Sequence, residues 1–289
     1  MKKYLYLLCS FSLLLSCRRE FEAPIPDTNW ELFDSPSATR LAQFTRNKIE
    51  GVYTLEQGAD AFGPLTAAKW SYTVTGTDTV HHLSFFLERA SAYFICEGKQ
   101  LDSAILLNGY WRRMTTTETG RVRLTIAKDG GARQLLIDST FNPPTPIVIS
   151  GTYGNGDATP DIPLSLRYTR PLNKAGQFEI LAHRGGGRTA DLLPASENSV
   201  EMIRMASRFG ATGIEIDVQM TKDGVPILFH DATLNERAVQ QNGLLGPIEN
   251  YSFAQLQTLV RIPKGERIPT LRQALETIVY NTPLDFVWL

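Results

Sequence analysis

Two histidines stand directly after short apolar segments in the second half of this 289-residue chain. His183 and Arg184 follow "ILA" and precede three glycines, and His230 follows "VPILF". Two such histidines are the minimum set for a general acid and a general base. Arg184 adds a planar guanidinium that fits a phosphate, and Gly185 begins a turn whose backbone N–H groups can approach an anion closely. The pattern therefore favours a phosphodiester site over a plain turn after a surface histidine.

Two carboxylates lie between these histidines in the sequence. Glu215 and Asp217 are two residues apart in "GIEIDV", so on a strand their side chains point to the same side. Burying two neighbouring carboxylates is costly unless a cation lies between them, and oxygen ligands suit a hard ion such as Ca²⁺ or Mg²⁺. A pair of solvated acids fits less well, because Ile214, Ile216 and Val218 interleave with them. We therefore predict a divalent-cation site at Glu215 and Asp217.

Alternating strands and helices must position these residues. "FEILAHRG" suits a strand buried on both faces, and three further strands are expected at "GIEIDVQM", "VPILFHD" and "PLDFVWL". Asn198 is expected to cap a helix that buries Met202 and Met205 and ends at Gly210, and "SFAQLQTLV" and "TLRQALETIV" predict two more helices. This order implies an α/β fold with a parallel sheet and right-handed crossovers. In a β/α barrel, the C-terminal ends of such strands form the active site.

Residues 46–172 have a different pattern. Short segments rich in β-branched and aromatic residues are separated by Gly, Asn, Asp and Pro: "WSYTVTG", "HHLSFFLE", "SAYFICEG", "SAILLNGYW", "GRVRLTIAKDGG", "RQLLIDS", "PIVISGTYG" and "IPLSLRYT". They predict an all-β antiparallel sandwich or small barrel. Trp70, Tyr110 and Trp111 suit its core, the alternative being a platform for a carbohydrate or another envelope ligand. His81 and His82 are adjacent, so on a strand they face opposite sides and do not suit one metal ion.

The N-terminus has the features of a bacterial export signal. Two lysines precede an apolar stretch that ends at Leu15 and is too short to span a bilayer. "LLSC" ends at Cys17 and resembles the lipobox of bacterial lipoproteins, which implies cleavage before Cys17 and a lipid on its sulfur. The alternative is an ordinary signal peptide. We expect a signal peptide over 1–17, a tether over 18–45, and a lipid-anchored location at the bacterial cell envelope, in the periplasm or on the outer membrane.

The composition limits the other partners. With 43% hydrophobic residues, the chain is too apolar for disorder. Its formal net charge of -1 gives no general attraction to nucleic acid, so we expect no nucleic-acid partner and only local phosphate binding. Of the three cysteines, Cys9 leaves with the signal and Cys17 carries the lipid. Cys96 is then alone, and no intramolecular disulfide is expected.

The ordered motifs of the C-terminal part resemble a known family. "HRGGG", "ENS", "GATGIEIDVQMTKDGVPILFHDATLNER" and "RIPTLRQALE" resemble the glycerophosphodiester phosphodiesterases over about residues 176–289. The resemblance implies a TIM barrel that cleaves glycerophosphodiesters into glycerol 3-phosphate and an alcohol. It implies that His183 and His230 form the acid/base pair and that Arg184, with the Gly185 turn, binds the phosphate.

The same resemblance assigns the acidic residues. Glu215 and Asp217 would hold a divalent ion, Ca²⁺ or Mg²⁺. Glu197 and Asn198 match the family's Glu-Asn pair and would support the site, although here Ala195 and Ser196 separate them from the preceding proline.

The end of the sequence departs from the family pattern. A TIM barrel needs ~200 residues or more, and the family's fourth strand carries Glu-x-Lys, whose Glu completes the metal site. Here that strand is "DFVWL" and the sequence ends at Leu289. We expect truncation of a longer enzyme, the alternative being a natural fragment. Two other functions stay open: a phosphoinositide-cleaving or sphingomyelinase D-like phospholipase, and a non-catalytic envelope-binding lipoprotein with a vestigial barrel.

Overall fold

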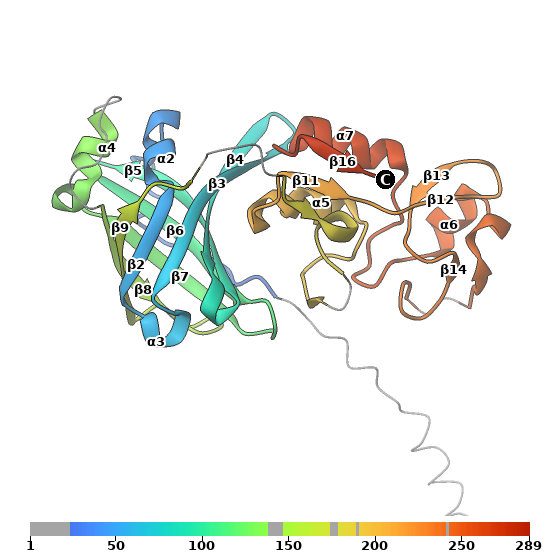
Figure 1. The fold of residues 1–289 in the computed structure, drawn as a ribbon, viewed down its shortest axis with the longest axis horizontal. Helices are drawn as coiled ribbons and strands as arrows, with labels where there is room; N and C mark the ends of the chain where they lie inside the picture. The colour runs from blue at the N-terminus through green and yellow to red at the C-terminus, as the bar shows by residue number, and fades with distance from the viewer. Residues whose placement is uncertain (1–23, 138–146, 174–178, 189–190, 241–242) are drawn as a thin grey trace, which may run out of the picture.

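The computed structural model describes residues 24–137, 147–173, 179–188, 191–240 and 243–289. The predicted signal peptide and Cys17 lie outside these residues. Figure 1 shows a β-barrel followed by a smaller part in which helices and short strands alternate. Within the described residues, no helix is both long enough and apolar enough to cross a membrane.

Eight antiparallel strands close the barrel. They are β2 (Gly51–Gln57), β3 (Leu65–Thr75), β4 (Asp78–Leu87), β5 (Ala92–Leu101), β6 (Ala104–Arg113), β7 (Thr119–Ile126), β8 (Val148–Tyr153) and β9 (Ile162–Arg170). Each strand pairs with the next, and β9 returns to β2, while β1 (Thr39–Arg40) adds to β5. Of the two architectures predicted, the barrel is therefore the one formed.

Strand periodicity explains the barrel's core. On β7, Val122, Leu124 and Ile126 are fully buried, and the residues between them face outward. Phe85 and Phe94 fill the interior from β4 and β5. Trp111 and the partly buried Trp70 pack in this core, as predicted, whereas Tyr110 is buried in a separate cluster with Tyr93 and Phe209.

Two segments of the barrel region differ from the sequence-based expectation. "RQLLIDS" was expected as a strand after a hairpin turn, but Lys128–Ala132 forms a π turn and Arg133–Ile137 the short helix α4. Leu135 is buried there. A helix can bury one such apolar side chain as well as a strand can, so this short segment did not distinguish the two. Residues 24–45, expected to be a tether, pack on the barrel with Phe33 and Leu41 buried. The helices α2 (Gln43–Ile49) and α3 (Ala59–Phe62) complete this part.

The C-terminal part contains a three-stranded parallel sheet. Its strands are β10 (Leu181–Ala182), β11 (Gly213–Glu215) and β16 (Phe286–Trp288), in that spatial order. Helix α5 (Val200–Ala206) and the 3₁₀ turn η5 (Ser207–Phe209) connect the first two strands, and α6 (Phe253–Leu259) and α7 (Leu271–Asn281) precede the third. Ser252 and Thr270 form capping boxes at α6 and α7, as expected of helices at these segments.

Three local expectations for this part are wrong. "VPILFHD" does not join the parallel sheet, because β13 (Pro226–Leu228) pairs antiparallel with β12 (Val218–Met220) across a tight turn. The first strand is not buried on both faces, since it is an edge strand and Leu181 is 40% exposed. The cap of α5 is Ser199, whose hydroxyl accepts from the Met202 backbone N–H. Gly210 ends the following turn in the left-handed conformation, as predicted.

A second small hairpin and one turn complete the fold. Strands β14 (Thr233–Leu234) and β15 (Gly246–Pro247) pair antiparallel, and the 3₁₀ turn η6 (Ile248–Asn250) follows them. Ile227, Phe229 and Leu234 belong to one buried cluster with α6, so the hairpins share a core that is separate from the one under the parallel sheet.

Candidate active site

The turn after β10 aims its backbone at the acidic strand. His183 and Arg184 lie in the 3₁₀ turn η3 (His183–Gly186), where Arg184 has a φ of 54°, which is rare for a residue with a side chain. The Arg184 N–H donates to Oε2 of Glu215 over 2.7 Å. Nε2 of His183 lies 4.0 Å from the same oxygen, and the His183 side chain is 60% exposed. The structure thus brings together the first histidine and the first carboxylate.

The glycines after Arg184 allow the turn to pack closely on the next loop. Gly185 is buried with a φ of 80°, and a Cβ there would lie 3.3 Å from the Asn198 backbone. A Cβ on Gly186, whose φ is 139°, would lie 2.8 Å from Cγ of Met202. These contacts account for the missing side chains without an anion, so phosphate binding by Gly185 stays a prediction.

Asn198 supports the second carboxylate. Its side-chain amide donates to Oδ2 of Asp217 over 2.8 Å, and its amide oxygen accepts from the Asp217 N–H. Its backbone N–H donates to the Arg184 carbonyl over 2.8 Å. Because Ser199 caps the helix instead, Asn198 is free to adopt a φ of 57° and face β11. Glu215 and Asp217 are both half-buried, with Ile216 fully buried between them, as the alternation predicts.

The second histidine is held by its neighbour. Nδ1 of His230 lies 2.6 Å from Oδ1 of Asp231. The same carboxylate accepts two hydrogen bonds from Arg237 and one from Asn235. Partial burial alone raises the pKa of Asp231, but the hydrogen bonds from Arg237, Asn235 and His230 outweigh burial and hold this pKa well below its usual range. A carboxylate that stays ionised accepts a hydrogen bond from the Nδ1–H of His230 and leaves Nε2 as the nitrogen available to substrate.

Glu197 joins the two halves of the site. Its carboxylate is only 7% exposed and accepts from Nη1 of Arg184 at 3.3 Å and from Nη1 of Arg237 at 2.8 Å. One network of contacts therefore runs from His183 through the acidic strand and Glu197 to His230. Every site residue that the sequence predicted within the described chain belongs to this network or, like Gly185, packs on it.

Sequence reasoning placed Asp231 beside His230 at the end of the strand but gave neither Asp231 nor Arg237 a role. Both lie in "HDATLNER", directly after His230, where a histidine followed by an acid and then by a basic residue six positions later is a weak but visible signal. The side chains meet because the loop turns back on itself at Asn235, whose amide oxygen accepts from the Arg237 and Ala238 backbone N–H groups.

The two strand carboxylates fit a hard divalent cation in chemical type. One oxygen of Glu215 and one of Asp217 are engaged by N–H donors, and no other described residue bonds to the second oxygen of either. A small cation such as Mg²⁺ commonly uses one or two carboxylates and completes its coordination with water and substrate. Among the residues described, no group of three or more His, Cys, Asp or Glu could hold a metal ion by itself.

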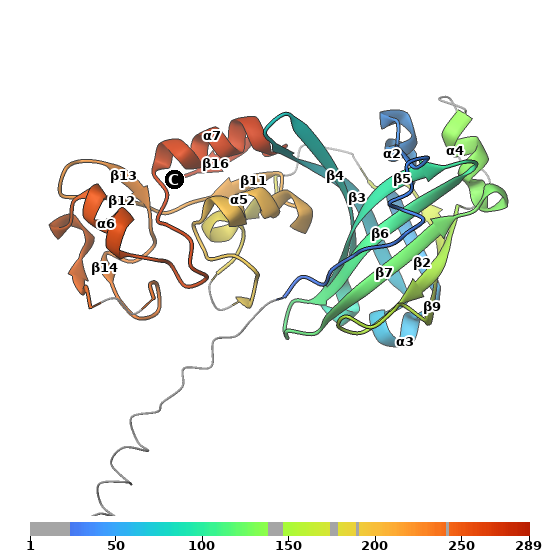
Figure 2. The same cartoon turned by 180° about the vertical axis from the view of Figure 1, so that it is seen from behind.

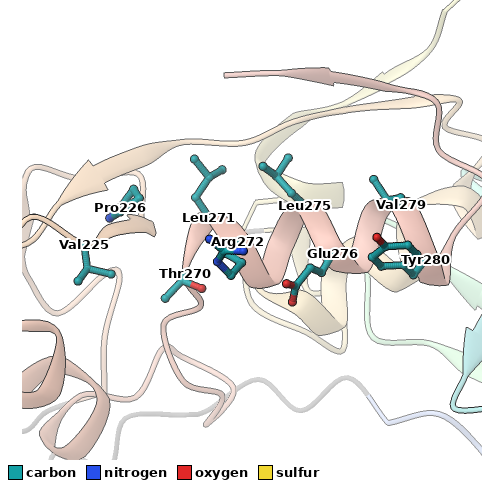
Figure 3. A pocket seen from close by; sticks show the side chains of 9 residues that line it. All are labelled: Val225, Pro226, Thr270, Leu271, Arg272, Leu275, Glu276, Val279 and Tyr280. Atoms are coloured by element: carbon teal, nitrogen blue, oxygen red, sulfur yellow. The ribbon is translucent and has the colours of Figure 1, made fainter.

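A separate groove lies along α7. It has a volume of about 670 Å³ and is lined mainly by α7 and by the start of β13. Figure 3 shows Leu271, Leu275 and Val279 in a row along one side of the helix. None of the predicted site residues lines it, so it does not belong to the network around the two histidines.

Comparison with known proteins relates the segment that holds this network to a protein family. Residues 183–286 match the Glycerophosphoryl diester phosphodiesterase family, and this segment holds both histidines and all the acidic residues of the network. Glycerophosphodiester phosphodiesterase 1 of Rattus norvegicus is 35% identical over 131 residues, which are 42% of this chain and 37% of that protein. Glycerophosphodiester phosphodiesterase of Caldanaerobacter subterraneus subsp. tengcongensis is 33% identical over 102 residues, which are 34% of this chain and 40% of that protein.

Two solved structures are similar to this chain over part of their length. A phosphodiesterase from Oleispira antarctica, in complex with its product sn-glycerol-3-phosphate, is 30% identical with a TM-score of 0.29, over 35% of this chain and 40% of that chain. A glycerophosphoryl diester phosphodiesterase from Parabacteroides distasonis is 34% identical with a TM-score of 0.30, over 39% of each chain. The chain thus spans about two fifths of the length of these relatives.

Proposed function

We propose that this protein hydrolyses glycerophosphodiesters to glycerol 3-phosphate and an alcohol, with His183 and His230 as the acid/base pair. The observation that carries the proposal is the connected network within the family-matched segment, which joins both histidines to Glu215 and Glu197. A general acid and a general base must flank the reacting group, and here two loops that are 47 residues apart in sequence are tied together to do so.

His230 exchanges its proton through Nε2. The ionised Asp231 accepts a hydrogen bond from Nδ1–H, which selects the neutral tautomer with the proton on Nδ1 and a lone pair on Nε2. In that tautomer Nε2 accepts a proton, and after accepting it the imidazolium is stabilised by the same carboxylate and can donate the proton back. His183, more exposed and near Glu215, supplies the second transfer. One histidine removes the proton of the nucleophile and the other protonates the departing alcohol oxygen.

Arg184 binds the phosphate through an atom that is otherwise unpaired. Its Nη1 is engaged by Glu197, but its Nε is buried and has no hydrogen-bond partner among the described residues. A buried N–H without an acceptor is costly, and a phosphate oxygen would satisfy it with a charge-assisted bond. Glu197, which is itself paired with Arg237, then holds the guanidinium through Nη1.

The proposal includes a divalent cation, Ca²⁺ or Mg²⁺, held by Glu215 and Asp217. Bound there, the ion would neutralise charge on the phosphate as a Lewis acid. Asn198 and the Arg184 backbone N–H each occupy one carboxylate oxygen, so they fix the orientation in which the other oxygens are presented.

The wider architecture is part of the same proposal. We infer that β10, β11 and β16 belong to a TIM-barrel-type sheet, whose active site forms at the C-terminal ends of its strands. We also infer export and lipid attachment at Cys17, which would place the enzyme at the bacterial cell envelope, close to glycerophosphodiesters released from phospholipids. A Cys17→Ser variant that still fractionates with membranes would contradict the anchor.

The decisive experiment measures release of glycerol 3-phosphate from a glycerophosphodiester in the presence of Ca²⁺ or Mg²⁺. We expect His183→Asn and His230→Asn to lower kcat by about 10²–10⁴-fold, and His81→Asn, in the barrel wall, to leave it unchanged. Phosphorus NMR of the products distinguishes this activity from the alternative. A cyclic phosphate product would identify a phosphoinositide-cleaving or sphingomyelinase D-like phospholipase. No turnover by the wild-type protein with either ion would refute the proposal.

A further inference from the structure

The barrel presents one outward face to the C-terminal part. Figures 1 and 2 show the β3–β4 hairpin beside the end of α7. There Asn281 donates to the Val74 carbonyl over 3.0 Å. Elsewhere in this contact between the barrel and the C-terminal part, called the seam below, the rings of Tyr93 and Phe209 meet edge to face with centroids 5.3 Å apart. The two parts are therefore in contact through both a hydrogen bond and an aromatic pair.

This seam has few directed bonds for its polarity. Buried side-chain atoms without a hydrogen-bond partner among the described residues include the hydroxyls of Tyr93, Tyr110 and Ser207 and Nε of Arg208. Buried polar groups are usually paired, so the few hydrogen bonds that cross the seam largely fix how the two parts are positioned against each other. The strongest of these, by donor charge and length, comes from Arg112.

Arg112 is a buried cation whose side-chain bonds, within the described residues, go to segments outside the barrel strands. It lies near the end of β6, is 1% exposed, and points outward from the strand. Its Nη2 donates to the Leu192 carbonyl over 2.5 Å, and its Nη1 lies 3.4 Å from the Pro24 carbonyl. The neighbouring Arg113 differs, because its guanidinium donates to the Ala61 and Ala90 carbonyls and so remains within the barrel.

Leu192 belongs to the loop that carries the active-site residues. This loop, residues 191–198, leads from the glycine turn to Glu197 and Asn198. Leu192 has a φ of 53°, a conformation that costs energy for a side chain of this kind and persists only when contacts impose it. Next to it, Leu193 is buried against the turn, so closely that a Cβ on Gly187 would lie 2.3 Å from its Cδ1. Moving Leu192 would therefore move the turn that holds Arg184.

We propose that the barrel positions the active-site loop through the bond from Arg112 to the Leu192 carbonyl. The barrel is then part of the catalytic apparatus, although it lies outside the family-matched segment and supplies no catalytic residue. Arg112 is a positioning residue, which acts through the loop on Glu197 and hence on Arg184. This inference rests on the proposed function for its effect on turnover, but not for its effect on the loop.

The test compares Arg112→Met with Arg113→Met in the full chain. Methionine retains an unbranched apolar stem but removes the donors and the charge, and Arg113 offers the same change on the next residue of the same strand. Hydrogen exchange of residues 191–198 is followed by mass spectrometry, alongside steady-state hydrolysis of a glycerophosphodiester. We expect exchange of this loop to rise about tenfold in Arg112→Met and to stay at the wild-type rate in Arg113→Met.

The kinetic readout separates positioning from a merely structural role. Because a small displacement of a positioning group lowers turnover strongly, kcat/KM is expected to fall about 10- to 100-fold in Arg112→Met. Arg112→Lys, which retains one charged donor, should recover part of that loss. Asn281→Ala, which removes a different seam bond, should leave loop exchange unchanged.

The outcomes are distinguishable from failure of the proposed function. If the wild-type protein hydrolyses nothing but loop exchange responds to Arg112→Met alone, the positioning inference stands and the proposed function fails. Unchanged exchange in a folded Arg112→Met variant, with a native near-UV spectrum, overturns the inference. Should that variant not fold, Arg112→Lys must show the same rise in exchange at smaller size, and an unchanged loop there overturns it equally.

Discussion

Replacing Asp231 by Asn tests whether this carboxylate sets the tautomer of His230. The change is nearly isosteric, so its effect comes from the hydrogen-bond pattern. In the native protein Oδ1 receives the His230 ring and Nη2 of Arg237, while Oδ2 receives Nε of Arg237 and the amide of Asn235. All four are donors, and an amide nitrogen placed at either oxygen position must face two of these groups.

The two positions are not equivalent. An amide nitrogen at the Oδ2 position would oppose two donors, and Asn235 cannot turn over easily because its own oxygen already accepts two backbone N–H groups. At the Oδ1 position the nitrogen opposes only Arg237, because the ring of His230 can switch to its other tautomer and accept at Nδ1. The substitution is therefore expected to move the proton of His230 to Nε2, the nitrogen that must accept a proton from the reacting groups.

The number of opposed donor pairs sets the size of the expected change in the tautomer population of His230. The two arrangements differ by one opposed donor pair, worth about 1–3 kcal/mol for a group left unsatisfied. With 1.4 kcal/mol per factor of ten, the productive tautomer falls to about a tenth to a hundredth of the population. We expect kcat to fall about 10- to 100-fold, which does not exceed the ~10²–10⁴ that a general acid or base contributes in full.

Two measurements check this chain of reasoning. Nitrogen NMR of ¹⁵N-histidine-labelled protein reports directly which ring nitrogen of His230 carries the proton, and hydrolysis kinetics report the cost. Asp223→Asn is the matched control, because Asp223 lies at the other end of the same hairpin and accepts hydrogen bonds from the Thr221 hydroxyl and the Phe253 N–H, away from His230. A fall in kcat without a change of tautomer, or an equal fall in the control, would refute the argument.

Three further predictions concern the acidic groups and the buried thiol. Glu215→Gln should lower activity about 10-fold or more and raise the concentration of Mg²⁺ or Ca²⁺ needed for half-maximal rate in a titration after chelator treatment, whereas Glu249→Gln, in the turn η6, should change neither. The pKa of Asp231 in the folded state is held below its usual value of about 4. The ionised carboxylate therefore stabilises the fold above about pH 4, and this contribution is lost as the pH falls below that value. Urea denaturation from pH 6 to 3 should accordingly show a smaller loss of stability in Asp231→Asn than in the wild type. Cys96 is 1% exposed and burial raises its pKa far above that of a free thiol, so a thiol reagent should label it only after unfolding, as followed by mass spectrometry.

Much of the site could be predicted because its residues follow strand ends. Glu215 and Asp217 alternate with buried isoleucines, and that period of two survives in the structure. The position of His230 was predicted for a partly wrong reason, since its strand joins a hairpin and not the parallel sheet. His230 still follows a strand next to the acidic segment, because the hairpin turns back and the Phe229 N–H donates to the Asp217 carbonyl over 3.0 Å.

Other features could not be predicted, because they depend on long-range contacts. A capping residue and its neighbour have the same polarity, so sequence alone did not distinguish Asn198 from Ser199 at the start of α5. The helix α4 and the packing of residues 24–45 on the barrel depend on which apolar anchors find a pocket, as Leu135 and Phe33 do. Arg112 looks like any arginine on the polar side of a strand until the second part of the chain covers it.

The placement of backbone strain gives an independent reason to expect support of the site from outside. Within the described residues, five residues other than glycine have a positive φ, and three of them are Arg184, Leu192 and Asn198. Each costs about 1–2 kcal/mol relative to ordinary backbone, so this one loop region stores several kcal/mol. Glu197 and Asp217 offset part of it through Arg184 and Asn198. Leu192 has no such partner within the site, and the bond that holds its carbonyl comes from Arg112 in the barrel. An active site strained in this way is expected to relax when the barrel contact is removed, even though every catalytic residue is still present.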